Sequence, residues 1–198
     1  MVVTDETDEM VVLCAPDGTA AGVMPKRLVH HHATPLHLAF SCYLFDHDGN
    51  FLVTRRARSK RTWPGVTTNS CCGHPSPDET LTVAIKRRII QELGVAATDI
   101  KPVLPAFSYK AEMDNGIVEN EICPVFMGFA DPAALAPNPE EVDGTEWISW
   151  PTFAAAVLSG ERQVSPWCAL QVSELARLGP DPLAWPVATQ GLPQAARL

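Results

Sequence analysis

The sequence predicts a single compact domain of the mixed α/β (α+β) class, with a mixed β-sheet packed between helices. Three observations support this fold class. The chain has 198 residues, of which 46% are hydrophobic and 19% are charged, as expected for a globular domain with one hydrophobic core. Short apolar runs that end at turn residues alternate with helical patterns. This alternation follows no regular strand–helix–strand order and contains no internal repeat, which favours a mixed sheet.

The strands are predicted from apolar, β-branched and aromatic runs bounded by turn signals. The segment Asp46-His47-Asp48-Gly49-Asn50 separates two such runs and predicts a hairpin, and Asp114-Asn115-Gly116 separates another pair. The predicted strands are residues 10–15, 20–24, 36–45, 51–55, 103–111, 117–129 and 146–150.

The clearest helix is predicted at residues 79–93. Gly94 is its stop signal, and its apolar residues recur at helical spacing: Leu81, Ile85, Ile89 and Leu93. Further helices are predicted at residues 151–158 and 166–178, and residues 26–32 are ambiguous between a short helix and a loop.

The predicted domain spans residues 10–178, with a tail at each end. Residues 1–9 carry four acidic residues and no basic one, so we expect a flexible acidic tail. Residues 179–198 form a proline-rich C-terminal tail, because Pro180, Pro182, Pro186 and Pro193 disfavour a stable element.

Charge and composition exclude several classes of protein. The net charge of −8 argues against a nucleic-acid-binding surface, and no apolar run approaches the roughly 20 residues of a membrane span. The acidic start lacks the positive charge of a signal peptide, and the six cysteines show no C-x-x-C spacing. We therefore expect a cytoplasmic protein with reduced thiols.

The basic residues are concentrated in one window. Residues 55–61 contain five of the fifteen lysines and arginines of the chain, Arg55, Arg56, Arg58, Lys60 and Arg61. Such a run is usually a solvated face, but in an acidic protein it can also form an anion site.

A metal site is suggested by carboxylates and histidines. Glu119 and Glu121 lie two apart in a predicted strand, so their carboxylates share one face and repel each other unless a cation or a shared proton intervenes. An exposed polar face is the alternative. Histidines occur at residues 30–32, at His37 and at His74. Three imidazoles and two carboxylates would suit zinc or manganese, although any one histidine can equally be a packing or surface residue.

Cys72 precedes Gly73-His74-Pro75 and is a candidate reactive thiolate, because nearby cations or a metal lower the pKa of a thiol. A small buried packing residue is the alternative.

The helix after this segment resembles the Nudix box, G-x5-E-x7-R-E-x-x-E-E-x-G, whose glutamates hold magnesium on a diphosphate. The frame matches at Gly73, Glu79, Arg87, Glu92 and Gly94, whereas Arg88 and Gln91 replace two glutamates. This departure removes acids that a Nudix hydrolase needs for metal-activated water. Diphosphate binding is still compatible with the altered box, because Arg88 and Glu92 lie one turn apart on one helix face.

Together, these segments resemble the type I isopentenyl-diphosphate isomerases, which have a Nudix-like fold. The similarity covers about residues 10–170. It rests on Leu36-His37-Leu38-Ala39-Phe40, Thr54-Arg55-Arg56-Ala57, Trp63-Pro64-Gly65, the segment from Asn69 to Pro75, Val118-Glu119-Asn120-Glu121 and Ser165-Pro166-Trp167.

The resemblance implies a role for each matching residue. A first metal, manganese or zinc, would be held by His30, His37, His74, Glu119 and Glu121, with His30 chosen over His31 and His32 by its spacing from His37. Magnesium would bind Glu92 together with the diphosphate. The catalytic residues would be Cys72 and Glu121, with Tyr109 hydrogen-bonded near Glu121 and Cys71 as a packing residue. Substrate would contact Lys26, Arg56, Lys60, Arg88 and Trp167.

The expected reaction interconverts isopentenyl and dimethylallyl diphosphate in isoprenoid biosynthesis. Glu121, assisted by Tyr109 and the metal, would protonate the alkene, and Cys72 as a thiolate would remove a proton from the opposite face. Trp167 would stabilise the cation through its ring face. The expected partner is this small-molecule diphosphate, without nucleic acid or membrane, and the chain would be a monomer or weak homodimer. A Nudix-type diphosphate hydrolase and a non-catalytic diphosphate- or metal-binding module are the alternatives; phosphate release would indicate the first and binding without turnover the second.

Overall fold

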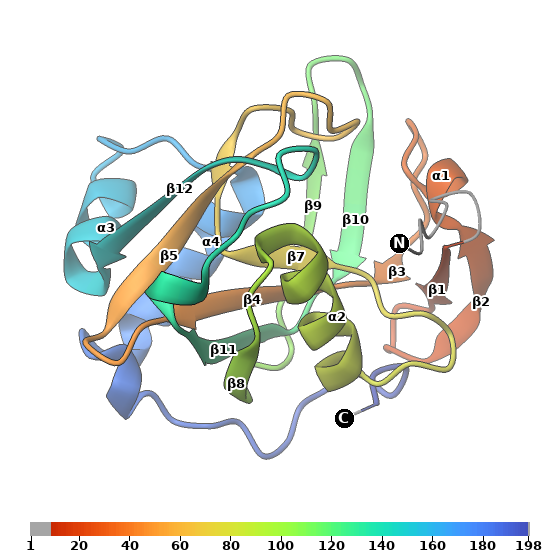
Figure 1. Cartoon of the computed structure of the whole chain (residues 1–198). Coiled ribbons are helices and arrows are strands. Elements are labelled where there is room, and N and C mark those ends of the chain that lie inside the picture. Colours follow the sequence, from red (N-terminus) through yellow and green to blue (C-terminus); the bar gives the residue numbers. More distant parts are fainter. Residues whose placement is uncertain (1–8, 198) are drawn as a thin grey trace.

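The computed structural model describes residues 9–197, which form two β-sheets and four α-helices (Figure 1). The strands are β1 (Met10–Cys14), β2 (Ala20–Pro25), β3 (His37–Leu38), β4 (Phe40–Phe45), β5 (Asn50–Arg56), β6 (Thr67–Thr68), β7 (Cys71–Gly73), β8 (Ala97–Leu104), β9 (Ser108–Glu112), β10 (Val118–Ile122), β11 (Val125–Ala130) and β12 (Val142–Ser149). The helices are α1 (Lys26–Val29), α2 (Leu81–Leu93), α3 (Trp150–Leu158) and α4 (Pro166–Leu175). The mixed α/β class is confirmed.

The larger sheet has the order β12-β5-β4-β11-β8, with β6 paired to β5 and β7 paired to β4. In β4, Phe40, Cys42 and Leu44 pack on the face that α2 covers, whereas Tyr43 and Phe45 pack on the face of α3 and α4. Figure 1 shows α2 in front of these strands and α4 behind them. A strand buried on both faces is apolar at nearly every position, which explains the apolar run of β4, where Ser41 is the one polar residue.

The smaller sheet has the order β2-β1-β3-β10-β9. It shares two chain segments with the larger sheet, because the predicted strand 36–45 is divided at Ala39 and the predicted strand 117–129 is divided at Cys123-Pro124. Proline lacks the N–H that a ladder requires. Both segments leave the smaller sheet side by side: β3 pairs with β10 in parallel, and β4 pairs with β11 in parallel. The predicted strand 103–111 is likewise divided, at Pro105, into the ends of β8 and β9.

Helix α2 begins two residues later than predicted. The Thr80 side chain caps its first turn by accepting a hydrogen bond from the Val83 N–H at 3.3 Å. Gly94 ends it with a φ of 65°, a left-handed conformation that favours glycine. The ambiguous segment after residue 25 is a helix only as far as Val29, because His30 is extended. No helix among residues 9–197 is long and apolar enough to cross a membrane.

The C-terminal segment contains a 3-10 turn at Pro182–Ala184 and otherwise no regular element after Gly179, yet it packs against the domain. The Trp185 ring is buried beside Phe45 and Trp150, with ring centroids 5.5 and 5.0 Å away. The Leu81 N–H donates to the Arg197 carbonyl at 2.7 Å. Proline excludes a helix here but does not prevent burial, so the packed unit extends beyond the predicted boundary at residue 178. The predicted flexible tail at residues 1–9 lies outside the described residues except for Glu9.

Candidate active site

One cleft, of about 890 Å³ including the space at its open mouth, collects the predicted site residues. It lies where the two sheets meet, because β10 of the smaller sheet and β7 of the larger both contribute to its wall. All predicted site residues except His37 line the cleft. His37 is fully buried behind it, with its ring 5.3 Å from His30 and 5.1 Å from His74.

Three histidines and one glutamate form a group at the inner end of this cleft. His30 follows α1, His37 lies on β3, His74 follows β7 and Glu121 lies on β10, and one ligand atom of each lies within 4.8 Å of the others. The parallel pairing of β3 and β10 places Glu121 opposite His37. The Glu121 Oε1 atom is 3.2 Å from His74 Nε2 and 3.5 Å from His37 Nε2.

The donor atoms of this group fit a divalent cation. Three buried ring nitrogens face no hydrogen-bond partner among the described residues: His30 Nε2, His37 Nε2 and His74 Nδ1. The other nitrogen of His37, Nδ1, bonds the Pro35 carbonyl at 2.9 Å, an arrangement that orients a ligating imidazole. Burial lowers the pKa of His30 to about 3 and that of His74 to about 4, so both rings are neutral and can donate a lone pair. Burial also acts to lower the pKa of His37, but Glu121 outweighs it and raises the pKa overall.

The two histidines adjacent to His30 lie elsewhere. His31 Nδ1 accepts the Ala33 N–H at 3.1 Å, and His32 Nδ1 lies 2.9 Å from the Gly116 carbonyl. Both side chains are exposed. The structure therefore places His30, and not its neighbours, beside His37 and His74.

Tyr109 and Glu119 form a hydrogen bond beside Glu121. The Tyr109 hydroxyl donates to Glu119 at 2.7 Å. Glu119 is not one of the four side chains whose ligand atoms lie within 4.8 Å of one another. Tyr109 stands directly opposite Glu121 across β9 and β10, so its ring can reach the next carboxylate on the same face. The Glu121 carboxylate is already directed to His37 and His74. Burial and the charge of Glu121 raise the pKa of Glu119 to about 7, whereas the two histidines outweigh burial and hold the pKa of Glu121 well below its usual range.

Cys72 lies on β7 with its sulfur 3.2 Å from Asn69 Oδ1 and 3.4 Å from Ser41 Oγ. Burial raises the pKa of Cys72 to about 12, and the hydrogen bonds of Ser41 and Asn69 and the charge of Arg56 do not offset it. Burial therefore favours the protonated form of Cys72 as long as no metal cation is bound in the cleft. Cys71 points to the opposite face of the strand and packs in the core beneath α2, as predicted.

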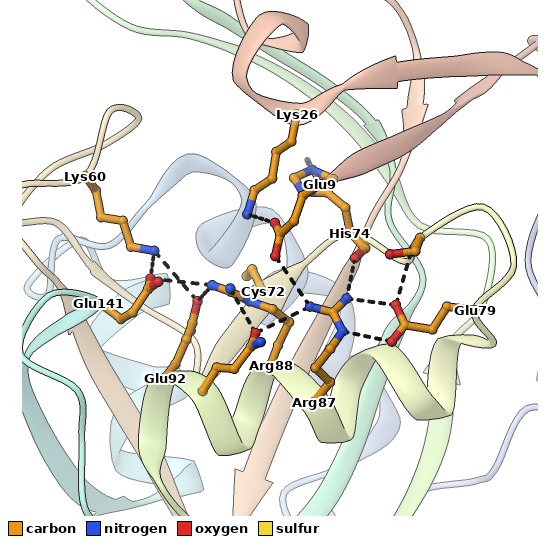
Figure 2. A network of polar contacts seen from close by, with 12 residues as sticks. Glu9, Lys26, Lys60, Cys72, His74, Glu79, Arg87, Arg88, Glu92 and Glu141 are labelled. Atoms are coloured by element: carbon orange, nitrogen blue, oxygen red, sulfur yellow. Dashed lines mark hydrogen bonds and ion pairs between the residues drawn. The ribbon is translucent and has the colours of Figure 1, made fainter. Parts of the chain in front are cut away.

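Cations and carboxylates alternate along a second wall of the cleft (Figure 2). Arg88 pairs with Glu92 one helical turn away and lies 3.4 Å from Glu141, while Lys60 pairs with Glu141 and lies 3.8 Å from Glu92. Burial lowers the pKa of Lys60 to about 8. For Glu92, burial acts to raise the pKa, but Arg88 and Lys60 outweigh it and lower the pKa overall. Lys26, also on this wall, pairs with Glu9 at 2.6 Å.

The basic window is thus divided between two surfaces. Arg56, Lys60 and Arg61 line the cleft, whereas Arg55 and Arg58 face Asp143 outside it. The sequence did not indicate that Glu141 would pair with cations of the cleft, because Glu141 belongs to no motif and precedes β12 in an irregular loop. The only available signal was an acidic pair, Glu140-Glu141, and such pairs are usually solvated.

The Nudix-box residues hold the helix against the cleft. The Glu79 carboxylate pairs with the Arg87 guanidinium at 2.7 Å. Gly73 allows α2 to approach β4, since a Cβ there would lie 2.9 Å from Arg88 Cγ and 3.0 Å from the Phe40 ring. The absence of a side chain at Gly73 therefore leaves room for the Arg88 side chain to extend into the cleft.

Trp167, the second residue of α4, lines the cleft with its ring buried. The Arg56 guanidinium lies 5.7 Å from its centroid, and the Tyr109 ring lies 5.9 Å away. The indole N–H donates to Asn69 Oδ1 at 3.0 Å.

Comparison with known proteins agrees with this geometry. Residues 35–168 match the NUDIX domain family. An isopentenyl-diphosphate Delta-isomerase of Saccharopolyspora erythraea is 56% identical, with 95% of this chain and 97% of the relative covered. One of Rhizobium rhizogenes is 53% identical, with coverage of 98% and 93%. The chain belongs to the isopentenyl-diphosphate Delta-isomerase family. Arg88 and Gln91, which replace two Nudix-box glutamates, therefore lie in the NUDIX domain of a member of the isomerase family.

Solved structures of lower identity show the same fold. A crystal structure from Deinococcus radiodurans superposes with a TM-score of 0.64 at 19% identity, covering 84% of this chain and 98% of that one. The MutT protein of Methanosarcina mazei gives 0.55 at 22% identity, covering 72% of this chain and 94% of that one. The predicted Nudix-like fold of this family member is confirmed.

Proposed function

We propose that the chain interconverts isopentenyl diphosphate and dimethylallyl diphosphate, an isomerisation that supplies isoprenoid biosynthesis. The observation that carries this proposal is its close similarity, over nearly the whole chain, to proteins named isopentenyl-diphosphate Delta-isomerase. The cleft supports it, because a partly buried thiol, two buried carboxylates and several cationic side chains line the same space.

The isomerisation adds a proton to one carbon of the alkene and removes a proton from another. Cys72 and Glu121 are the proposed proton-transfer groups. Because the reaction is reversible, each group donates in one direction and accepts in the other, and the protonated thiol of Cys72 is one of the two starting states. The Tyr109 hydroxyl holds the neighbouring carboxylate of Glu119 in place.

The intermediate of such a proton transfer is a tertiary carbocation, which water would destroy. The buried Trp167 ring presents π-electron density to this charge and helps to exclude water. Arg56, Lys60 and Arg88, together with Lys26, are proposed to hold the diphosphate away from the reacting carbons. Their role is to position the substrate.

Two divalent cations are proposed. His30, His37, His74 and Glu121, together with the neighbouring Glu119, would hold manganese or zinc, which would stabilise the negative charge of the carboxylate that exchanges a proton. Magnesium would bind Glu92 together with the diphosphate oxygens and neutralise their charge.

The proposal is tested by incubating the purified chain with isopentenyl diphosphate in deuterated water and following the products by NMR. We expect deuterium in the new methyl group and no release of phosphate. Phosphate release without deuterated dimethylallyl diphosphate would refute the isomerase and favour a NUDIX hydrolase. The replacement of two acidic residues by Arg88 and Gln91 makes hydrolysis unexpected, because acidic ligands for a water-activating metal are missing.

A further inference from the structure

Asn69 lies between the strand that carries Cys72 and the helix that carries Trp167, and its side chain is fully buried. The Oδ1 atom of Asn69 accepts the indole N–H of Trp167 at 3.0 Å and the thiol of Cys72 at 3.2 Å. One oxygen atom therefore joins two side chains of the cleft wall, and the mechanism above gives Asn69 no role.

The orientation of the Asn69 amide is set by its other end. The Nδ2 group donates to the Cys71 carbonyl at 2.9 Å and to the Cys42 carbonyl at 3.2 Å. Reversing the amide would place Oδ1 against two carbonyls and an amino group against the indole N–H. Buried donors and acceptors would then lack partners, which disfavours the reversed amide. The acceptor is thus directed toward Trp167 and Cys72 by the backbone of β4 and β7.

A third donor competes for the same oxygen, but it has another partner. The Thr68 hydroxyl lies 3.0 Å from Asn69 Oδ1 and 2.7 Å from Ser165 Oγ, so it can bond either. A carbonyl oxygen has two lone pairs. The Trp167 N–H has no other acceptor among the described residues, so its orientation depends on Asn69.

We propose that Asn69 is a positioning residue for the isomerisation, holding the sulfur of Cys72 and the ring of Trp167 at a fixed spacing on the cleft wall. The inference rests on the roles proposed above for these two residues. The sulfur must reach a carbon that exchanges a proton while the ring faces the adjacent charged carbon. An error of about 1 Å in such an arrangement can lower a rate by about 100-fold. Asn69 does not touch the substrate, and none of its hydrogen bonds involves the diphosphate wall.

The test combines a spectroscopic measurement with kinetics. The chain has five tryptophans, and the ¹H–¹⁵N indole signal of Trp167 is identified by its loss in Trp167→Phe, which keeps a ring but removes the donor. In Asn69→Ala we expect this signal to move upfield and to exchange with solvent faster. We expect kcat to fall by about 10- to 100-fold and KM to stay within about twofold, because the diphosphate contacts are unchanged.

Thr68→Val is the matched control, because it removes a buried hydroxyl bonded to the same oxygen. It should leave the Trp167 signal at its position and change kcat by no more than about twofold. The Trp167 N–H and the Cys72 thiol both keep their bond to Asn69 in this variant. In the double variant Asn69→Ala/Trp167→Phe, the loss of kcat should be smaller than the product of the two single losses, because both changes break one shared bond.

An unshifted Trp167 signal in Asn69→Ala, or a kcat within twofold of the unmodified chain, would overturn the proposal. Equal losses in Asn69→Ala and Thr68→Val would also overturn it, because they would indicate a general packing defect. If Asn69→Ala does not fold, Asn69→Ser is judged by the same two measurements. Failure of the unmodified chain to isomerise its substrate would instead refute the proposed function, and the indole spectrum distinguishes the two failures.

Discussion

Replacing His30 by alanine should weaken cation binding strongly, although His30 is one of three consecutive histidines. His30 Nε2 is buried without a partner among the described residues, and the ring lies 5.3 Å from His37 and 5.6 Å from His74. The neighbouring His31 and His32 are exposed. One imidazole should therefore contribute to binding and the next two should not.

The magnitude follows from the four ligands that the structure groups together. Four-ligand zinc sites bind with about 10–16 kcal/mol, so one ligand contributes roughly 2.5–4 kcal/mol. At 1.4 kcal/mol for each factor of ten, His30→Ala should raise the dissociation constant by about 100- to 1,000-fold. His31→Ala and His32→Ala should change it by less than about threefold, because neither ring loses a metal bond.

The assay is competition for zinc between the metal-stripped chain and a chromophoric chelator, with circular dichroism to verify folding. His30→Ala binding within threefold of the unmodified chain would refute the assignment. So would a large loss in His31→Ala, because the ligand would then be the adjacent histidine. Both results are independent of the isomerisation assay.

Three further predictions concern catalysis, substrate binding and folding. Cys72→Ala should lower kcat by at least about 100-fold, whereas Cys71→Ala, in the core on the opposite face, should retain turnover; the reverse pattern in an isomerisation assay would contradict the assignment. Arg88→Ala should lower kcat/KM, with a loss of transition-state stabilisation of about 1.5–3 kcal/mol, because a charged diphosphate contact is lost; unchanged steady-state kinetics would exclude that contact. Trp185→Ala should lower the free energy of unfolding in urea by about 3–5 kcal/mol, because its ring is buried against the domain; a loss below about 1 kcal/mol would show that the C-terminal segment does not stabilise the fold.

The sequence predicted the parts of the site that belong to local patterns. The E-x-E spacing places Glu119 and Glu121 on one strand face, and the strand β10 carries both. Alternation along an extended chain places Cys71 in the core and Cys72 at the cleft, as the structure has them. Residue identity, spacing and side-chain period are fully present in the chain itself, so such expectations need no tertiary information.

The tertiary structure decided which of these groups meet. Glu121 lies beside His37 because two long apolar runs leave the smaller sheet together, at Ala39 and at Pro124, and this parallel register joins residues 84 positions apart. The Tyr109 hydroxyl bonds Glu119 because the histidines already engage Glu121. Periodicity reports local conformation and burial, whereas strand pairing and side-chain orientation depend on distant segments that pack simultaneously. For that reason the sequence alone left the contacts of Glu119, Asn69 and Glu141 undetermined.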